Sequence, residues 1–521
     1  MKTNSFSKQD ERQAKKRGIS VAEMTKQMSR FKKGFSFVRL TSPCVVNKGI
    51  IKLSPQEQNR AEKHFLAVAW QKKSVKFVPA SGAASRMFLF LEDAKPEYND
   101  LKKLFLKRLP DFAFYSELAK AIKKKGLDIM KLRRAKDLKP IVEALLEEDG
   151  LDYRQAPKGM ILFHREGKKA RTGFEEQLSE GILFADKKGR AQLHFTLPSQ
   201  SRMEVRNHLK IAARGARHSF LLSDSIQSPA TDCLAMEKSG EPVRTDKRQL
   251  LFRPAGHGAL LSNLNHIKKA GFIYVKNIDN ILPTANRKES DQWKRILCGV
   301  FLETQEKTFK AQKILEKKKM MPEEALFVIQ LAAKLGWKAP SSFSQRLGGS
   351  PNRHKGRESL SHFFHRPLRV CGMVPKTGEP GGGPFWTKNR YGNITPQIVE
   401  SAEVNFKSKQ QETIWRSSTH FNPVEFVCGT YDAHGKKFNL MEFADAERGL
   451  IAKKNYQGRE IRVMELPGLW NGGMANWITV FIEISVSAFA PVKTALDLLR
   501  PEHQPRKMKV NQAATIKGIK K

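Results

Sequence analysis

The spacing of apolar and polar positions divides the chain into helical and strand-like segments. Residues 1–70 are predicted to be mainly helical, because apolar residues recur at helical spacing after a Lys-rich start. Residues 97–150 and 286–345 have the same periodicity with charged outer faces, so helices are predicted there as well. The run Val75–Pro79 is short, β-branched and aromatic, and turn residues follow it, which predicts a buried strand.

Further strands are predicted at Gly159–His164, Gln192–Leu197, Gln249–Phe252, Phe272–Lys276, Val424–Val427 and Val480–Ile484. Strands that alternate with helices favour an α/β fold built on a sheet. The stretch Ser341–Arg369 is rich in Ser, Gly, Arg and His, so it is predicted to be loop or linker.

These patterns divide the chain into five expected parts. They are a helical N-terminal extension (1–70), an α/β core (71–285), a helical insertion with a linker (286–369), a second part of the core (370–500) and a basic disordered tail (501–521).

The charge balance is strongly basic, but the basic residues are dispersed. The 521 residues include 94 Lys and Arg against 52 Asp and Glu, a formal net charge of +42. Most basic runs fall between apolar residues at helical spacing and are interpreted as solvated helix faces. No zinc-finger or RNA-recognition motif is present, so nucleic acid is not the expected partner, although a basic nucleic-acid-associated protein stays an alternative. The charge favours anionic small molecules instead.

Cysteine and histidine patterns give no sign of a metal centre. The five cysteines lie far apart without a C-x-x-C pair, which predicts reduced, buried thiols. His362 and His365 have a spacing that zinc ligands use, but no acidic or Cys partner is near, so they are interpreted as a surface pair. The most apolar stretch, Trp477–Val492, is interrupted by Glu483 and is too short for a membrane span. A cytoplasmic protein is expected; its oligomeric state is not fixed by the sequence.

The segment Phe77–Phe88 combines a strand, a loop of small residues and the start of a helix. The backbone N–H groups of Ser81, Gly82 and Ala83 could approach an anion closely, and Arg86 could hold a phosphate with two hydrogen bonds. Small-residue turns also serve plain strand–helix packing, so both interpretations stay open.

A carboxylate follows the predicted strand Phe272–Lys276. Asp279 stands at the carboxyl end of this strand, where α/β folds place ligands. Mg²⁺ prefers oxygen ligands, often one or two carboxylates together with substrate phosphates, and Asp279 suits that task. The alternative is an Asx turn that closes the strand.

Three further segments carry candidate chemistry. Gly256 and Gly258 flank His257, so the backbone can bend sharply and pack against a flat ring, or simply make a tight turn. Three glycines at 381–383 suggest a close approach of the backbone to a ligand, or a flexible loop. Lys493 follows a Pro-containing turn and precedes a predicted helix, so its ammonium could point at a phosphate or into solvent.

Together these segments resemble nucleotidyltransferases of the UDP-sugar pyrophosphorylase type. The matching motifs are SGAASRM (81–87), RPAGHG (253–258), KNIDN (276–280), PKTGEPGGG (375–383) and FAPVKTALDLL (489–499). More closely, the chain resembles an uncharacterised bacterial group, the domain-of-unknown-function 4301 family. The stretches that add to this second resemblance are ARTGFEEQLSEG (170–181), LHFTLPSQ (193–200), ELPGLWNGGMANW (465–477) and LLRPEHQ (498–504).

The resemblance implies a GT-A, Rossmann-like mixed sheet flanked by helices, with nucleotide bound by residues 71–285 and sugar by residues 370–500. It implies transfer of a nucleotidyl group, expected to be uridylyl, from an NTP to a sugar 1-phosphate with release of pyrophosphate. A nucleotide-sugar-binding protein or a glycosyltransferase-like protein is the alternative with the same fold.

The resemblance also implies individual roles. Arg86 and Lys493 would be catalytic and Asp279 would bind Mg²⁺; Ser81, Gly82, Ala83, Gly256, His257 and Gly258 would bind the nucleotide, and Thr377 and Gly382 the sugar. Three positions depart from the family pattern. Residues 88–91 stand where a Pro-Lys pair normally follows the first loop, Ala259 replaces an Asp after the GHG turn, and Asn476 stands where the closer family has an Asp.

Overall fold

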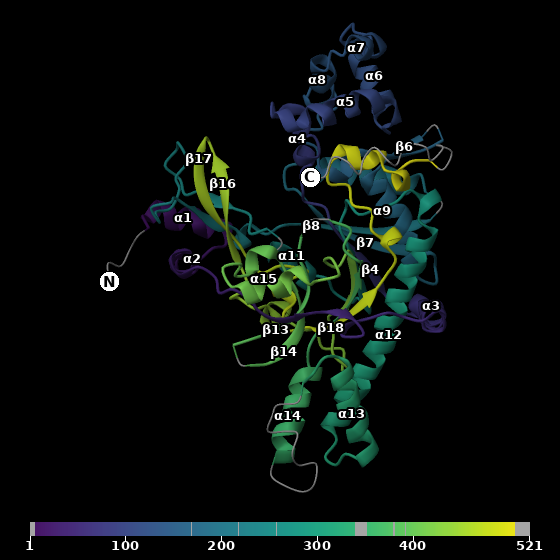
Figure 1. Cartoon of the computed structure of the whole chain (residues 1–521), viewed down its shortest axis with the longest axis vertical. Helices are drawn as coiled ribbons and strands as arrows, with labels where there is room; N and C mark the ends of the chain where they lie inside the picture. The colour runs from purple at the N-terminus through teal and green to yellow at the C-terminus, as the bar shows by residue number, and fades with distance from the viewer. Residues whose placement is uncertain are drawn as a thin grey trace. The chain divides into compact units, whose positions relative to one another are not determined.

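The computed structural model consists of two compact units, each assembled from three stretches of the chain (Figure 1). Unit 1 comprises Met1–Val68, Gln227–Tyr274 and Ile296–Ile484, and unit 2 comprises Ala69–Ile226, Val275–Arg295 and Ser485–Lys521. The structure describes residues 6–167, 169–216, 218–256, 258–338, 352–378, 381–390 and 392–505.

Unit 2 contains three parallel strands. They are β4 (Ser74–Pro79), β7 (Arg190–Leu197) and β8 (Ser219–Ile226), with β7 in the middle. Every residue of β4 is buried, as expected for a strand covered on both faces. Helices α9 (Gly173–Gly181) and α10 (Arg202–Arg214) contribute Phe174, Leu178, Val205 and Leu209 to the core beside these strands.

Four helices follow β4 along the chain within unit 2, as the sequence predicts. They are α5 (Asn99–Arg108), α6 (Tyr115–Lys124), α7 (Ile129–Ala135) and α8 (Lys139–Leu146) (Figure 1). Their apolar faces enclose a cluster of phenylalanines in which the rings of Phe112 and Phe114 stack 4.8 Å apart. Ile281, Val492 and Leu498 belong to the same cluster, so the helices pack on the segments that carry Asp279 and Lys493.

Unit 1 contains a mixed sheet. Its strands lie in the order β2 (Val45–Val46), β3 (Gly49–Ile51), β18 (Ile478–Glu483), β12 (Leu368–Met373) and β15 (Glu425–Gly429). β12 is parallel to β18 and antiparallel to β15, and β18 is parallel to β3. The strand β11 (Phe272–Lys276) has residues in both units.

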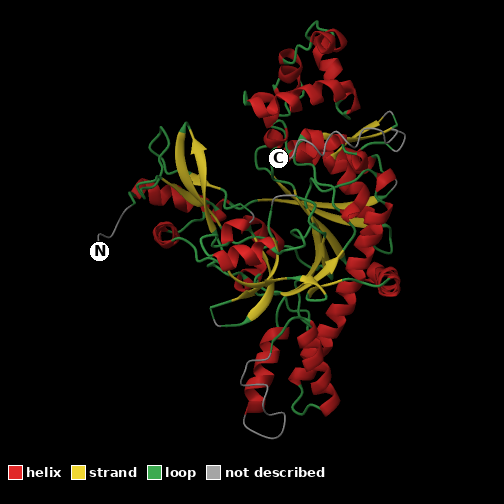
Figure 2. Cartoon of the chain, viewed as in Figure 1, coloured by secondary structure: helices red, strands yellow, loops and turns green. Residues whose placement is uncertain are grey.

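Two smaller sheets complete unit 1 (Figure 2). One has the order β1 (Arg39–Pro43), β13 (Gly383–Lys388) and β14 (Ile394–Val399); the other has the order β10 (Phe252–Arg253), β9 (Cys233–Met236), β17 (Arg459–Glu465) and β16 (Leu450–Tyr456).

Several helices of unit 1 pack on these sheets or on one another. They are α1 (Lys8–Arg17), α2 (Val21–Lys33), α3 (Pro55–Val68), α11 (Gly258–Asn265), α13 (Pro322–Lys334), α14 (Asn352–Phe364) and α15 (Lys409–Arg416). Helix α12 (Lys288–Glu316) has residues in both units.

The mixed α/β fold is confirmed, and some local predictions are not. Residues 39–51 form short strands inside a region predicted to be mainly helical. The loop predicted at Ser341–Arg369 contains α14, because Leu360, Phe363 and Phe364 bury an apolar face there. After the small-residue loop the chain makes a 3₁₀ turn, Ala84–Met87, before the short helix α4 (Leu89–Glu92).

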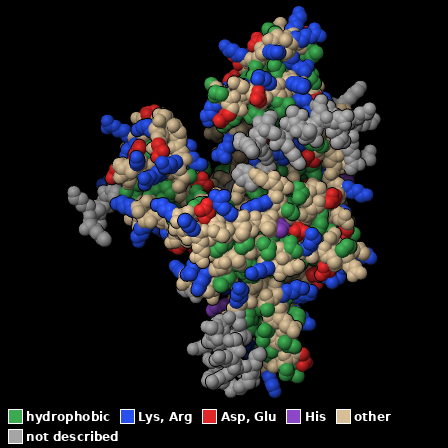
Figure 3. Space-filling view, in the orientation of Figure 1, with side chains coloured by type: hydrophobic (Ala, Val, Ile, Leu, Met, Phe, Trp, Pro, Cys, Tyr) green, Lys and Arg blue, Asp and Glu red, His purple; other side chains and the backbone are tan. Residues whose placement is uncertain are grey.

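The predictions about cysteine and charge agree with the structure. All five cysteines are buried and free. Lys and Arg side chains are spread over the visible face and interspersed with acidic ones (Figure 3). Within the described residues, no helix has the length and apolar character that a membrane crossing requires.

Candidate functional site

In unit 2, the loop after β4 lies against the segment that carries Asp279. The backbone N–H of Ile278 donates to the carbonyl of Pro79 over 3.1 Å, so the two segments leave their strands together. Ala80, the first loop residue, donates its N–H to the carbonyl of Thr196 in β7 over the same distance of 3.1 Å. The small-residue loop and Asp279 are therefore neighbours at the carboxyl ends of strands, where α/β folds bind ligands.

A lysine that the sequence analysis did not single out joins this site. The N–H of Lys158 donates to the carbonyl of Gly82 over 3.0 Å. Its ammonium Nζ lies 2.6 Å from Oδ2 of Asp279, and the two side chains are 14% and 26% exposed. Residues 157–158 are a Pro-Lys pair, and they return the chain to the loop after the helices between residues 99 and 146.

Lys493 comes to the same region through its backbone. The N–H of Val492 donates to the carbonyl of Asp279 over 2.8 Å, and Asn280 pairs with Pro491 in an antiparallel bridge. The N–H of Lys493 donates to Oδ2 of Asp497 over 2.8 Å, which fixes the turn, while its side chain is exposed. Two cationic segments therefore lie on either side of Asp279.

Arg86 lies four residues after Gly82, in the exposed part of the 3₁₀ turn. The N–H of Ala84, which opens this turn, donates to the carbonyl of Ala156 over 3.0 Å. Among the described residues, no carboxylate pairs with the guanidinium of Arg86. Its charge is available to an anion at the loop.

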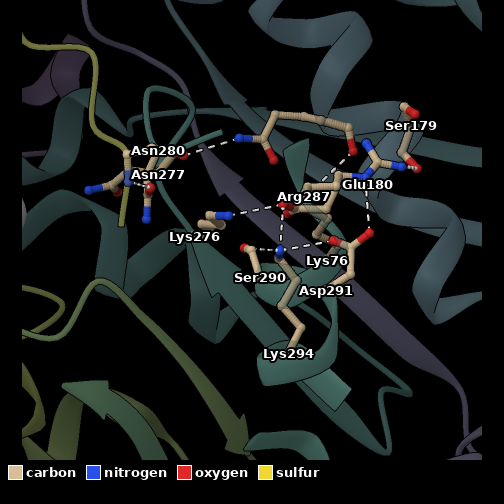
Figure 4. A network of polar contacts seen from close by, with 12 residues as sticks. Lys76, Ser179, Glu180, Lys276, Asn277, Asn280, Arg287, Ser290, Asp291 and Lys294 are labelled. Atoms are coloured by element: carbon tan, nitrogen blue, oxygen red, sulfur yellow. Dashed lines mark hydrogen bonds and ion pairs between the residues drawn. The ribbon is translucent and has the colours of Figure 1, made fainter. Parts of the chain in front are cut away.

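A buried ionic network anchors the strand that leads to Asp279 (Figure 4). Glu180, at the end of α9, contacts the ammonium groups of Lys76, Lys276 and Lys294 at 2.8, 2.9 and 3.0 Å. Its neighbour Gln177 donates from Nε2 to the carbonyls of residues 277 and 278 at 3.1 and 3.2 Å. Helix α9 thus fixes both the strand end and the backbone next to Asp279.

Three lysines surround the single carboxylate of Glu180 in this network. Burial lowers the pKa of Lys76 to about 7, although Glu180 acts in the opposite direction. Burial by itself disfavours the charged form of Glu180, but the surrounding ammonium groups hold the pKa of this carboxyl well below its usual range. Lys294 also pairs with Asp291 at 3.1 Å. The network therefore consists of an ionised carboxylate and lysines of which one sheds its proton near neutrality.

The glycine turn predicted to bind nucleotide lies in unit 1 and has a packing role. Gly256 adopts a φ of +67°, and a Cβ there would lie 3.3 Å from the carboxylate of Glu465. A Cβ on Gly258, the first residue of α11, would lie 2.6 Å from the Cβ of Leu466. Position 256 therefore favours glycine because of its φ, and position 258 because of its close packing against Leu466. His257, between them, lies outside the described residues.

The predicted sugar-binding residues also belong to unit 1. Gly382 is buried, and a Cβ there would lie 2.3 Å from the carbonyl of Val399, so this glycine permits close packing. Thr377 is exposed and follows Lys376, whose ammonium lies 5.7 Å from the centre of the Trp415 ring. A cavity of about 450 Å³ beside it is lined by Lys376, Phe406, Trp415 and Arg416. No local pattern predicts this aromatic wall, because Trp415 comes from the separate helix α15 and Phe406 from the loop before it.

One carboxylate at the site is compatible with a metal shared with a substrate. Among the described residues, no group of three or more His, Cys, Asp or Glu could hold a metal ion. Oδ1 of Asp279 makes no hydrogen bond within the described part of the chain, while Oδ2 is paired with Lys158. Asp279 thus fits Mg²⁺ only when phosphate oxygens complete its coordination.

The fold and the site define an α/β protein whose candidate anion-binding loop, carboxylate and cations gather at the carboxyl ends of strands. The chain belongs to the family described as Domain of unknown function (DUF4301), which it matches over residues 7–504. Comparison with curated proteins gives no match.

Solved structures of low sequence identity are similar to this chain. One is the uridine diphosphate N-acetylglucosamine pyrophosphorylase from Trypanosoma brucei in complex with an inhibitor, at 12% identity and a TM-score of 0.47, covering 92% of this chain and 75% of that one. Another is a mutant UDP-glucose pyrophosphorylase from Leishmania major in complex with UDP-glucose, at 11% identity and a TM-score of 0.39, covering 95% and 79%.

Proposed function

We propose that the chain is a nucleotidyltransferase that makes an NDP-sugar and pyrophosphate from an NTP and a sugar 1-phosphate, with uridylyl as the expected group. The observation that carries the proposal is the meeting, in unit 2, of the loop at Gly82, the Lys158–Asp279 pair and the segment before Lys493. Small-residue backbone, a carboxylate and cations together suit the binding and activation of polyphosphate.

The reaction joins two anions, so the protein must neutralise charge and align the reacting groups. A phosphate oxygen of the sugar phosphate attacks the α-phosphorus, and the bond from that phosphorus to the β-phosphate oxygen breaks. Backbone N–H groups near Gly82 and the guanidinium of Arg86 hold the nucleotide phosphates. The ammonium of Lys493 stabilises the leaving pyrophosphate. This chemistry requires no protein nucleophile.

Mg²⁺ bound with the nucleotide would neutralise phosphate oxygens, and Asp279 is the residue that would hold it. In this proposal Lys158 orients the carboxylate of Asp279 before the nucleotide arrives. When the nucleotide binds, the ammonium of Lys158 contacts its phosphates, because the carboxylate of Asp279 would then hold Mg²⁺. Lys158 thus performs the task of the Pro-Lys pair that is missing after the first loop.

The sugar phosphate is assigned to unit 1. Thr377 follows Lys376, which lines the cavity together with Phe406 and Trp415. An aromatic face of this kind suits the apolar side of a sugar ring. Gly256, His257 and Gly258 are assigned to the base, and Gly382 keeps the sugar loop close to its support.

A binding protein or a glycosyltransferase-like protein with the same loops is the second candidate. The Lys158–Asp279 ion pair favours it, because this contact occupies one carboxylate oxygen that a metal would use. Only the nucleotidyltransferase forms or consumes pyrophosphate, so detection of pyrophosphate separates the two candidates.

The proposal predicts a specific loss of turnover in three variants. Arg86→Ala, Lys158→Ala and Lys493→Ala should each lower kcat/KM by about 100-fold or more, equivalent to ~3 kcal/mol, because each removes a cation from the phosphates. The assay measures pyrophosphate formed from UTP with glucose 1-phosphate or N-acetylglucosamine 1-phosphate.

Lys188→Ala, an exposed lysine in a turn of unit 2, is the matched control and should keep full turnover. Equal turnover in the wild-type protein and in all three site variants would remove these residues from the mechanism.

A further inference from the structure

Unit 1 has a second cavity. It lies where the parallel strands β12 and β18 begin, whereas Lys376 follows the other end of β12. It has a volume of about 430 Å³, and its lining includes Trp337, Lys338, Glu358, His362, Arg366 and Asn476. Arg366 and Asn476 each stand two residues before a strand, because the parallel strands β12 and β18 begin at Leu368 and Ile478. Six residues of strand, about 20 Å, separate this end from the end that leads to Lys376.

Arg366 is the main electrostatic feature of this cavity. Its Nε–H donates to the carbonyl of His362 over 3.2 Å, and its guanidinium carbon lies 5.7 Å from the centre of the Phe363 ring. No carboxylate pairs with it anywhere in the described residues. The residue is half-buried, and burial lowers the pKa of its guanidinium. A cation held in this way gains most from an anionic ligand.

The remaining lining residues add donors and a second cation. The ammonium of Lys338 lies 5.1 Å from the centre of the Trp386 ring, which holds the side chain at the cavity. Asn393 and Asn476 line the cavity with amide side chains that can donate hydrogen bonds. Glu358 is the one acidic residue among the lining residues that the structure describes, and it is exposed. Two cations against one carboxylate leave the lining positive.

We propose that this cavity binds a small phosphorylated metabolite, with its phosphate between Arg366 and Lys338. The amide groups of Asn393 and Asn476 complete the hydrogen bonds to the phosphate oxygens, and Glu358 accepts from hydroxyl groups on the rest of the molecule. The volume lies within the range of small-molecule sites, roughly 300–1,000 Å³. This site is separate from the loops assigned to nucleotidyl transfer and does not depend on that assignment.

Fluorine NMR on the full chain labelled with 5-fluorotryptophan tests the proposal locally. Trp337 lines the cavity, and Trp337→Phe identifies its resonance by the loss of one signal. Titration with inorganic phosphate and with pyrophosphate should shift this resonance to saturation. Arg366→Gln and Lys338→Gln should each weaken the apparent affinity by about tenfold or more, because each removes a charge-assisted hydrogen bond.

Two controls make the outcome specific. Lys334→Gln removes an exposed lysine of α13, four residues before Lys338, and should leave the titration unchanged. Arg86→Ala should also leave it unchanged, so a failure of the proposed nucleotide site would not be mistaken for a failure here. A Trp337 resonance that does not move at millimolar pyrophosphate, or that titrates equally in Arg366→Gln and Lys338→Gln, would overturn the proposal.

Discussion

At the scale of single residues, Asp279 and Lys158 mark what a local pattern can and cannot predict. Asp279 directly follows an apolar run, so its place at the end of a buried strand is readable from the sequence. Lys158 pairs with it from 121 positions away along the chain. No periodicity connects the two, because the contact is created by the return of the chain after a helical insertion. The Pro-Lys-Gly sequence at 157–159 was the only local signal for it.

Burial of a histidine at this scale gives a testable pH dependence. His194 in β7 stacks on Phe77 at 5.5 Å and exchanges hydrogen bonds with Ser223 and Ser225. Burial lowers its pKa from 6.5 to about 4, although Asp224 acts in the opposite direction. Between pH 6.5 and about pH 4, the His194 side chain is protonated in the unfolded chain but neutral in the folded chain. The histidine therefore makes the protein less stable as pH falls through this window.

Replacement by an uncharged side chain should flatten this pH dependence. As the pH falls from 7 to below 4, His194→Asn is expected to lose about 3 kcal/mol less free energy of unfolding than the wild-type protein. The reason is that asparagine binds no proton. Urea unfolding of both proteins at pH 7 and at successively lower pH gives the free energy of unfolding at each pH. The slope of this free energy against pH is then compared between the two proteins. Identical slopes would mean that His194 has the same pKa in the folded and the unfolded chain.

At the scale of elements, apolar periodicity identified β4, β7, β11 and the helices between 99 and 146 well. It did not predict what the polar residue inside β4 does. Lys76 looks like a solvated position, yet it is fully buried beside Glu180, and the two other lysines come from β11 and α12. Such a cluster depends on four elements, β4, α9, β11 and α12, that meet only in the folded chain. Local composition likewise failed for α14, where three buried apolar side chains outweigh a loop-like sequence.

The buried network predicts a large loss of stability when its carboxylate is neutralised. Glu180→Gln should lower the free energy of unfolding by about 3 kcal/mol or more, because three buried lysines lose their shared counter-charge. Chemical denaturation of the variant measures this loss, and Glu143→Gln, an exposed position on α8, should change stability little.

A second substitution distinguishes charge from packing in this network. Adding Lys76→Met to Glu180→Gln should recover part of the lost stability, because the cost of burying or deprotonating Lys76 without its counter-charge is removed and a side chain of similar length fills its place. A double variant less stable than Glu180→Gln alone would contradict the charge argument.

At the scale of the whole molecule, segments that lie far apart along the chain meet in the fold of unit 2. The helices between residues 99 and 146 stand between the small-residue loop and the Pro-Lys pair, and the fold restores their contact. The sequence therefore predicts the fold class and the strand ends, but not this pairing. The high positive charge is spread over the surface (Figure 3), which fits anionic small ligands better than a single groove for a polymer.

The exchange of labelled pyrophosphate into UTP tests the central claim most directly. The wild-type chain, incubated with a UDP-sugar, Mg²⁺ and labelled pyrophosphate, should form labelled UTP, and Lys158→Ala and Lys493→Ala should lose this exchange by about 100-fold. Tight binding of the UDP-sugar by the wild-type chain with no label in any NTP, across a panel of bases and sugars, would contradict nucleotidyl transfer and leave a binding protein or glycosyltransferase instead.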